Sequence, residues 1–377
     1  MLNISFKLYR SKKNKKIHQM INTSAWVWNH CVALQKRHYR LYKKYIPTGK
    51  LQKHIGKLRN KNLRWQELNS QTVQELCQRL DLAYKRFFKR LAKRPPKFKK
   101  AKNFNSFVLK QSGWSLDENK LTINKKHHFK FTKSRDYENV KRATVKRDKL
   151  GDIYLFLQCQ MKSKRYKREG KSSIGMDFGL KTYLTFDDGS KKESPEFFKK
   201  FQKEIKIANR QLSTKKNGSN NRIKAKQNLA RIHINVANKR ADFQWKLAHE
   251  LCKQNNFIAI EDLNMDAMKR LWGKKISDLS FSTQVKRLEH VALKYGTKIQ
   301  KIGKFFPSSK MCGCGTINKE LKLSDRVWDC QSCGVKNERD VLAAKNIKSE
   351  GIRLYRTDCQ TSVKRSKSGL KVESRLL

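Results

Sequence analysis

Three acidic residues stand where a carboxylate needs a structural or a chemical reason. Asp177 lies inside the apolar segment IGMDFG, Glu261 ends the apolar segment FIAIE, and Asp340 opens the segment DVLAAKNI. A charge is costly to bury without a partner. Taken singly, each acid is explained as well by strand-end solvation or by helix capping, for which Asp340 is well suited. Taken together, they offer three carboxylates at two strand ends and one helix start.

That combination predicts a divalent-metal site. Carboxylate oxygens are hard ligands that suit Mg²⁺, and a pair of such ions activates water and stabilises the leaving oxygen in phosphodiester cleavage. We therefore expect these three acids to be catalytic and to bind Mg²⁺, with two ions in the site. Three other acids compete for the role. We expect Asp187 and Asp188 to form a turn and Asp262 to be only a strand-end neighbour of Glu261.

A second metal site is indicated by cysteines, since four of the nine fall within residues 312–333. One pair lies in KMCGCG and the other in CQSCG, with the fifteen residues 315–329 between them. Two such pairs are typical of a zinc ribbon, in which four thiolates bind Zn²⁺ tetrahedrally. The predicted ligands are Cys312, Cys314, Cys330 and Cys333. The first pair has only one intervening residue, so a degenerate ribbon that folds by packing alone is the alternative.

The other cysteines and the charge balance bound the class of protein. Cys31, Cys77, Cys159 and Cys252 are scattered and are expected to be small buried hydrophobic residues. Lys and Arg number 89 against 31 acids, which gives a formal net charge of +58. So large a charge opposes compaction unless a polyanion neutralises it, which favours a nucleic acid as partner. The alternative is a layer of solvated lysines.

The ends of the chain and its apolar segments give no sign of a membrane. The opening MLNISFKLYRSKKNKK lacks the apolar core of a signal peptide. No apolar run approaches the roughly 20 residues that a bilayer span needs. We expect a cytoplasmic protein without a membrane partner, and 377 residues suffice for two or three domains.

The first half of the chain alternates between strand and helix patterns. Residues 1–10 are predicted to form a strand, and a helical pattern follows from Ile17. A second helix is predicted from Ser70 to Arg94, ended by two prolines. The basic connector KRPPKFKKAKNF comes next, and its phenylalanines favour a phosphate-tracking surface with stacking rings; a disordered linker is the alternative. Residues 105–165 are β-rich, with a hairpin formed by VKRATVKRD and IYLFLQCQM.

A linker, SKRYKREGKSS, separates this half from an α/β half, with the boundary near Ser172. Strands are predicted at IGMDFGL, TYLTF, FIAIEDL and TKIQKIG. Helices are predicted over about 195–253, broken near 215–221, and over 282–295 and 340–350. From Tyr355 onward the sequence has no periodicity, which predicts a disordered basic tail.

Several of these segments resemble one family. IGMDFGLKTYLTFDDG, IAIEDLNM and SSKMCGCG…LSDRVWDCQSCGVKNERDVLAAKNI are similar to the three RuvC motifs and the interposed zinc ribbon of TnpB proteins, which are tied to insertion-sequence transposons and are related to type V CRISPR effectors. WVWNHCVAL, NSQTVQELCQRLDLAYKRFF and KFKKAKNFNSF are similar to the family's front half. The resemblance assigns the catalytic acids and the zinc ligands to the residues predicted above. It departs at Cys312 and Cys314, because the family has two residues between its first cysteines.

The resemblance implies a multidomain α+β fold, divided by residue number. A wedge β-barrel would comprise 1–12 and 103–170, with a helical recognition domain, 13–102, inserted. A RuvC-like domain of RNase H fold (α/β) would comprise 172–307 and 339–354, with a zinc ribbon at 308–338. The basic tail would be 355–377.

The resemblance also implies an activity. Members bind an RNA from the transposon end and cleave double-stranded DNA beside a short motif, with base pairing to the guide supplying the sequence specificity. We accordingly expect an RNA-guided, metal-dependent DNA endonuclease, and a monomer. The principal alternative is a nuclease-inactive RNA-guided repressor. A general RNA-binding protein would leave the buried acids unexplained, and a DNA-joining transposase would require strand-transfer activity.

Overall fold

The computed structural model describes residues 2–160, 165–322 and 324–367, apart from the side chains of 266, 274 and 361–367. The chain divides into two compact units, Met1–Ser163 and Lys164–Leu377. The division falls slightly before the predicted boundary at Ser172. The reason is that the basic segment before the first strand is attached to the second unit: the N–H of Tyr166 donates to the Lys294 carbonyl (2.9 Å), and that of Glu169 to Lys253 (2.9 Å).

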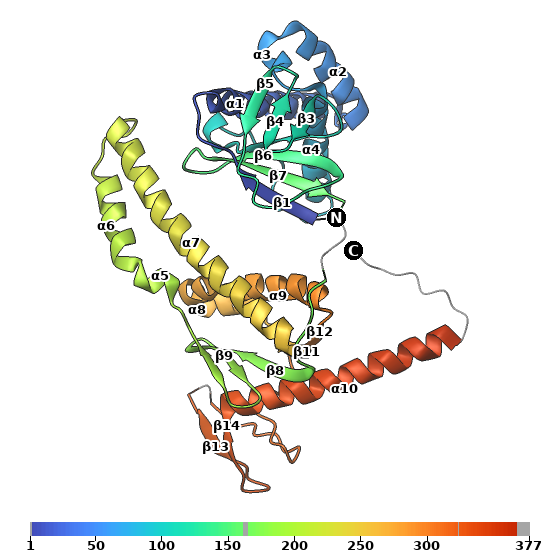
Figure 1. Ribbon diagram of the computed structural model, residues 1–377, viewed down its shortest axis with the longest axis vertical. Coiled ribbons are helices and arrows are strands. Elements are labelled where there is room, and N and C mark those ends of the chain that lie inside the picture. The colour runs from blue at the N-terminus through green and yellow to red at the C-terminus, as the bar shows by residue number, and fades with distance from the viewer. Residues whose placement is uncertain (1, 161–164, 323, 368–377) are drawn as a thin grey trace. The chain divides into compact units, whose positions relative to one another are not determined.

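The first unit contains two antiparallel sheets (Figure 1). The four-stranded sheet has the order β1 (Leu2–Lys7), β7 (Ile153–Cys159), β6 (Val140–Arg147), β2 (Ser106–Leu109). The predicted first strand and the predicted hairpin are both present, and alternate residues of β7 are buried. The second sheet consists of β3 (Trp114–Asp117), β4 (Lys120–Ile123) and β5 (His127–Lys130). A bridge between Leu8 and Phe131 joins the chain beside β1 to the end of this sheet.

Helices α1 (Asn14–Tyr42), α2 (Thr48–Lys61), α3 (Leu63–Gln66) and α4 (Ser70–Phe88) complete the first unit. The prediction that the last of these extends to Arg94 is wrong, because α4 ends at Phe88 and Arg90 has a left-handed backbone (φ 57°). The residue before a proline is disfavoured in helical geometry. Proline thus accounts for Arg94, while the left-handed backbone at Arg90 ends the helix earlier, so the four basic residues Lys89, Arg90, Lys93 and Arg94 do not lie on a helix face.

The basic connector is docked on α1, so the disordered alternative is wrong. Asn29 holds the connector by two hydrogen bonds: its side-chain amide donates to the Lys99 carbonyl (2.9 Å) and its oxygen accepts from the Lys99 N–H (2.8 Å). The indole of Trp28 donates to the Lys97 carbonyl (3.2 Å). Of the two phenylalanines predicted to stack, Phe104 is a core residue with 3% exposure, because it packs among the apolar side chains of the unit. Phe98 alone is exposed.

The second unit is built on a five-stranded mixed sheet. Its order is β10 (Lys191–Glu193), β9 (Thr182–Phe186), β8 (Ser172–Phe178), β11 (Asn255–Glu261), β12 (Lys298–Ile302). Strands β8, β11 and β12 are parallel, whereas β9 and β10 are antiparallel to their neighbours. Helices α5 (Phe197–Lys200), α6 (Gln202–Ser213) and α7 (Asn220–Gln254) connect β10 to β11. Helices α8 (Met265–Leu279) and α9 (Phe281–Tyr295) connect β11 to β12. The break predicted near 215–221 lies between α6 and α7.

Alternate residues of β11 divide the core between the two faces of this sheet. Ile258 and Ile260 pack in the cluster that includes residues of α7 and α9, whereas Phe257 and Ala259 face α10 (Arg339–Lys367). A β-carbon added at Gly175 of β8 would lie 2.1 Å from the Ala344 carbonyl of α10. Glycine therefore permits α10 to lie directly against the sheet, and the helix runs past the strand ends in Figure 1.

The prediction of a disordered tail from Tyr355 is wrong up to residue 367, and the closing helix is longer than the predicted 340–350. Helix α10 continues through this segment, and the Tyr355 ring lies 5.6 Å from that of Phe257 in β11. Tertiary contact and the absence of proline extend a helix that the aperiodic sequence does not indicate. Residues 368–377 of the predicted tail lie outside the described residues.

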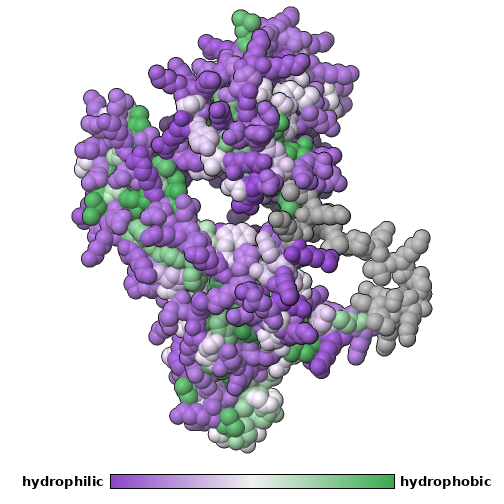
Figure 2. Space-filling model, in the orientation of Figure 1, coloured by the Kyte–Doolittle hydropathy of each residue, from purple (hydrophilic) through white to green (hydrophobic). Residues whose placement is uncertain are grey.

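A small cysteine module precedes α10. It contains the hairpin of β13 (Val327–Asp329) and β14 (Lys336–Glu338) and a compact apolar cluster, made of Cys312, Leu321, Trp328, Cys330 and Leu342. Hydrophilic side chains cover most of the face shown in Figure 2. Among the described residues, no helix has both the length and the apolar character that a membrane crossing requires.

Candidate active site and thiol metal centre

Two of the predicted catalytic acids lie at the ends of neighbouring parallel strands. The last registered pair between β8 and β11 is Met176 with Ile260, and Asp177 and Glu261 are the next residue on each strand. Neighbouring strands are about 4.8 Å apart. Because side chains alternate along a strand, Asp177 projects on the same face as Gly175, and Glu261 on the same face as Ala259. Both acids thus face α10.

The third acid arrives from the helix. Along β11, Ala259 contacts α10 at Gly351 and Phe257 contacts it at Tyr355, so α10 runs antiparallel to this strand. One helical turn before Ala344 is Asp340, in the first turn of α10. The start of the helix therefore lies at the strand ends that carry the other two acids. A carboxylate is favoured there, because the N-terminal end of a helix carries partial positive charge.

The electrostatics agree with this placement. Burial, and then the charges of Glu261 and Asp340, raise the pKa of Asp177 to about 7, while the Arg339 guanidinium opposes the rise. Burial raises the pKa of Glu261 above its usual range, and the Ser308 hydroxyl opposes this. The Asp177 side chain is half-buried, so part of it reaches solvent, but protein atoms surround its carboxylate densely. Two neighbouring acids with raised pKa values, Asp177 and Glu261, form an environment in which a bound cation would favour the ionised carboxylates.

The three carboxylates are not close enough together in the structure to form a complete ligand set for one metal ion. Among the described residues, the cysteine cluster is the group of three or more candidate ligands whose atoms all lie within 4.8 Å of one another. Arg326 Nη1 lies 3.3 Å from Asp340 Oδ1, and this ion pair holds Asp340 toward the cysteine module. The fold thus brings the three acids to one edge without drawing them together around a single point.

Two further residues of this edge were not predicted. The Ser308 hydroxyl donates to Glu261 Oε1 at 2.5 Å, and Ser308 is 7% exposed. The buried amide of Asn346 on α10 donates to the carbonyls of Ser308 (2.7 Å) and Met311 (2.6 Å). A chain of hydrogen bonds therefore runs from α10 through the loop to Glu261. The segments PSSK and KNI carry no periodicity that would reveal it.

The rival acids have other tasks. Asp187 accepts from the Gly175 N–H (2.8 Å) and pairs with Lys348 Nζ (2.6 Å), so it ties the sheet to α10 rather than forming only a turn. Asp188 accepts from the N–H of Ser190 (2.8 Å), as a turn residue does. Asp262 is exposed, and its N–H donates to the Ile302 carbonyl (3.2 Å). It therefore stays a strand-end neighbour.

The four predicted thiols converge despite the shortened first pair. Cys312 Sγ lies 3.6 Å from Cys333 Sγ, and Cys314 Sγ lies 3.6 Å from Cys330 Sγ. A tetrahedral Zn²⁺ with bonds of about 2.3 Å would separate its sulfurs by roughly 3.8 Å. The four sulfurs thus fit Zn²⁺ in both chemistry and spacing. Each of the two close contacts joins a cysteine of the first pair to one of the second, so the thiols converge although the first pair has only one intervening residue.

The environment of the thiols also suits a cation. The Thr316 hydroxyl and N–H lower the pKa of Cys314 to about 6. The Cys314 N–H and the Asn337 amide lower the pKa of Cys312. The Val335 N–H lowers the pKa of Cys333, but the neighbouring thiols outweigh it and raise that pKa to about 12. Four thiols without a cation cannot all ionise, because each thiolate disfavours the next.

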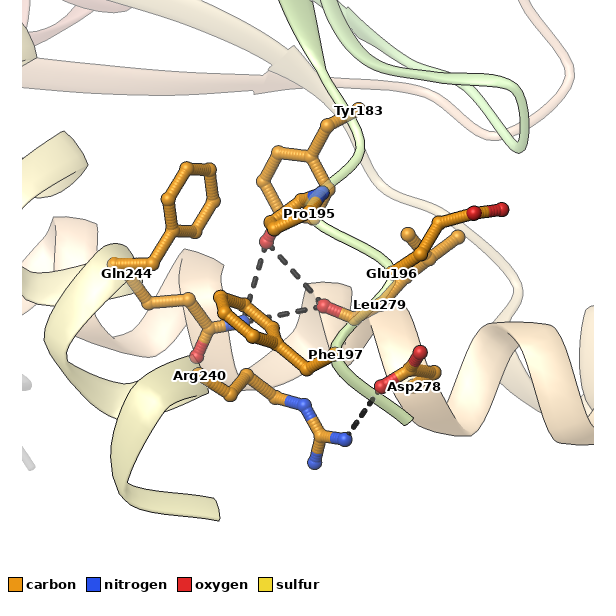
Figure 3. Close-up of a pocket in the computed structure, with 9 residues that line it drawn as sticks. Tyr183, Pro195, Glu196, Phe197, Arg240, Gln244, Asp278 and Leu279 are labelled. Atoms are coloured by element: carbon orange, nitrogen blue, oxygen red, sulfur yellow. Dashed lines mark hydrogen bonds and ion pairs between the residues drawn. The ribbon is translucent and has the colours of Figure 1, made fainter. Parts of the chain in front are cut away.

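A cluster of polar side chains elsewhere in the second unit holds two helices together and is not a binding site (Figure 3). Gln244 donates to the Tyr183 hydroxyl (3.2 Å) and to the Leu279 carbonyl (3.2 Å), and Arg240 pairs with Asp278 (2.6 Å). The cavity among them is about 10 Å³. That space holds at most one water, so this network fastens α7 to α8.

Fold and site together define a multidomain α+β protein whose second unit carries a three-acid sheet edge and a four-thiol module. Two family models match the chain: the one described as "Probable transposase" over residues 156–271, which begins in β7 of the first unit, and the one described as "Cas12f1-like, TNB domain" over 281–347.

Whole-protein relatives extend the match to the first unit. A Streptomyces pristinaespiralis protein named "Putative RNA-guided DNA endonuclease" is 30% identical over 293 residues, 76% of this chain and 72% of the relative. An Escherichia coli K12 protein of the same description is 28% identical over 347 residues, 86% of each. "TnpB-like" proteins of Acanthamoeba polyphaga mimivirus are 29% identical over 229 residues, covering 56% of this chain and 44% of the relative. The chain belongs to the TnpB family.

The fold agrees with that membership. A solved complex of Cas12f1 with sgRNA and target DNA superposes with a TM-score of 0.57 at 15% identity, covering 90% of this chain and 83% of the other. At that identity the likeness concerns the fold alone.

Proposed function

We propose that the protein is an RNA-guided DNA endonuclease of an insertion-sequence transposon. The observation that carries the proposal is the meeting of Asp177, Glu261 and the start of α10 at one sheet edge. The names of the S. pristinaespiralis and E. coli relatives support the same activity. The partners we assign are a guide RNA from the transposon end and a double-stranded DNA target.

The finer domain roles follow from this assignment. Strands β8–β12 with α10 would be the RuvC-like domain of RNase H fold, with the cysteine module as its zinc ribbon. The two sheets of the first unit would be the wedge barrel, and α1–α4 its recognition domain. The net charge of +58 supports long contacts with phosphate backbones. The docked connector adds a fixed row of lysines to the first unit.

The three acids would hold Mg²⁺. Two such ions, when bound, would supply the activation of water and the stabilisation of the leaving oxygen in phosphodiester hydrolysis. The residues themselves prepare the site. Asp177 must give up the proton that its pKa of about 7 retains. The hydrogen bond from the Ser308 hydroxyl to Oε1 holds the Glu261 carboxylate in one orientation. To bind a metal ion, Asp340 must either break its ion pair with Arg326 or bind the ion while keeping that pair. Zn²⁺ on the four thiols would fix the module that leads into α10.

A matched pair of substitutions tests the proposal. Asp177→Asn preserves shape but removes the charge, and we expect it to abolish cleavage of a matched target in Mg²⁺ while the protein still binds the guide RNA. Asp188→Asn, at a turn acid eleven positions on, should cleave as the unchanged protein does. Cleavage retained by Asp177→Asn would remove this residue from the mechanism. An unchanged protein that binds its target through the RNA but does not cut would favour the repressor instead.

A further inference from the structure

Phe305 is the most exposed large hydrophobic residue among those that the structure describes. Its exposure is 96%, whereas the adjacent Phe306 is turned inward and packs against a cluster containing Phe257, Ile302 and Ile347. The two phenylalanines therefore share a segment but not an environment. An aromatic ring held fully in water contributes nothing to the core, so it is free to contact a ligand without disturbing the fold.

The loop that carries Phe305 is anchored at both ends beside Glu261. Ile302 pairs with Glu261 in the sheet, and Ser308 donates to the Glu261 carboxylate at 2.5 Å. Phe305 is three residues from each anchor, so its α-carbon lies within roughly 10 Å of both. Between the anchors, the Phe306 N–H donates to the Gly303 carbonyl (3.2 Å) and the Ser308 N–H to the Phe306 carbonyl (2.8 Å). The loop is thus a tight turn that presents one ring.

The surroundings of the ring favour a nucleobase over a protein surface. Its immediate neighbours Gly303 and Lys304 are exposed, so the ring is isolated and does not belong to an apolar patch. Protein-binding patches on soluble proteins extend over several hundred Å². A single exposed aromatic ring beside a cationic side chain, here Lys304, is the kind of feature on which a base of a single-stranded nucleic acid stacks. A cleft of about 180 Å³ beside Glu261 is lined by Lys286 and by the ion pair of Lys301 with Glu289 (2.7 Å).

We propose that Phe305 stacks on an unpaired base of the DNA strand that enters the acid site, and so positions its phosphate at Glu261. The inference rests on the proposed endonuclease function and adds a positioning residue to it. Stacking of a base on an aromatic side chain is worth about 1–3 kcal/mol. Loss of the ring should therefore raise the DNA concentration needed for half-maximal cleavage rate about 5- to 150-fold.

A fluorescent base tests the stacking without requiring cleavage. The protein–guide complex carrying Asp177→Asn is bound to targets in which 2-aminopurine replaces one base at a time around the cut site. We expect quenching at one or two positions, and its loss in Phe305→Ala and Phe305→Leu. Phe305→Trp should retain it. Leu293→Ala, at another strongly exposed side chain (81%) of the same unit, is the control and should leave quenching unchanged.

Cleavage by the complex with native Asp177 completes the test. Phe305→Ala should raise the DNA concentration needed for half-maximal rate, while its melting temperature stays unchanged, since the ring makes no core contact. Quenching that is absent at every position, or unaltered in Phe305→Ala, overturns the stacking inference. Ring-dependent quenching in a complex that never cuts would overturn the endonuclease proposal and leave the stacking standing.

Discussion

Removing one hydroxyl at Ser308 should change the pH dependence of cleavage in a way that a loss of folding would not. Ser308→Ala deletes the donor that lies 2.5 Å from Glu261 Oε1. Burial already raises the pKa of Glu261, and this hydrogen bond opposes the rise. Without it, the protonated form of Glu261 gains and its pKa rises further. A protonated Glu261 is a poor ligand for Mg²⁺, so activity should be lost from the acidic side.

The size of the effect follows from the strength of the bond. A hydrogen bond to a charged group contributes about 1.5–3 kcal/mol, and one pKa unit corresponds to about 1.4 kcal/mol. Glu261 is only partly shielded from water, so the lower end of that range applies, which corresponds to about a tenfold change. The variant should cut about tenfold more slowly than the unchanged protein at acidic pH, and equally fast at alkaline pH.

Single-turnover cleavage between about pH 6 and 9, at one subsaturating Mg²⁺ concentration and saturating guide RNA, measures the ratio of the two rates. Asp177 responds to the charge of Glu261, so the ratio reports the linked titration of both acids. Ser309→Ala is the matched control, because no described side-chain hydrogen bond joins Ser309 to Glu261. A ratio that stays constant across the pH range would refute the argument, since it would mean that Ser308 acts on structure alone.

Three more outcomes are expected. Because the pKa of Asp177 is raised to about 7, the apparent affinity for Mg²⁺ should fall about tenfold per unit as pH drops below 7, and a flat profile in Mg²⁺ titrations would contradict the acid site. Metal analysis should find one Zn²⁺ per chain, and it should be lost in Cys330→Ser but retained in Cys359→Ser, a substitution of an exposed cysteine outside the cluster. Gly175→Ala, whose new β-carbon would meet the Ala344 carbonyl, should lower the free energy of unfolding by about 1–3 kcal/mol. Gly273→Ala, with open space at that position, should not; equal unfolding midpoints in denaturant would show that α10 moves aside freely.

The positions of many candidate site residues could be predicted from the sequence because the signals for them are local. Cysteine pairs at short spacing indicate a thiol site wherever the chain folds, and the four sulfurs do converge. Apolar strands that contain or end in an acid likewise predicted Asp177 and Glu261 at the strand ends. The hairpin of β6 and β7 followed from alternation and a turn, which act over a few residues.

Other features depended on contacts between distant segments. Phe104 is buried by the helices and strands around it, and the helix past Tyr355 is supported by Phe257, nearly a hundred positions away in the sequence. Neither has a local signal, because burial and helix extension are decided by whichever surface happens to be nearby.

The sequence by itself determined which residues could bind metals and, through its net charge of +58, what kind of partner to expect. The tertiary structure alone decided that Gly175 lets α10 bring Asp340 to the strand ends, and that Ser308 and Asn346 orient Glu261. The physical reason is that each position of the sequence gives the chemistry of its own side chain directly. The distances between the carboxylates, in contrast, depend on how the helix packs on the sheet.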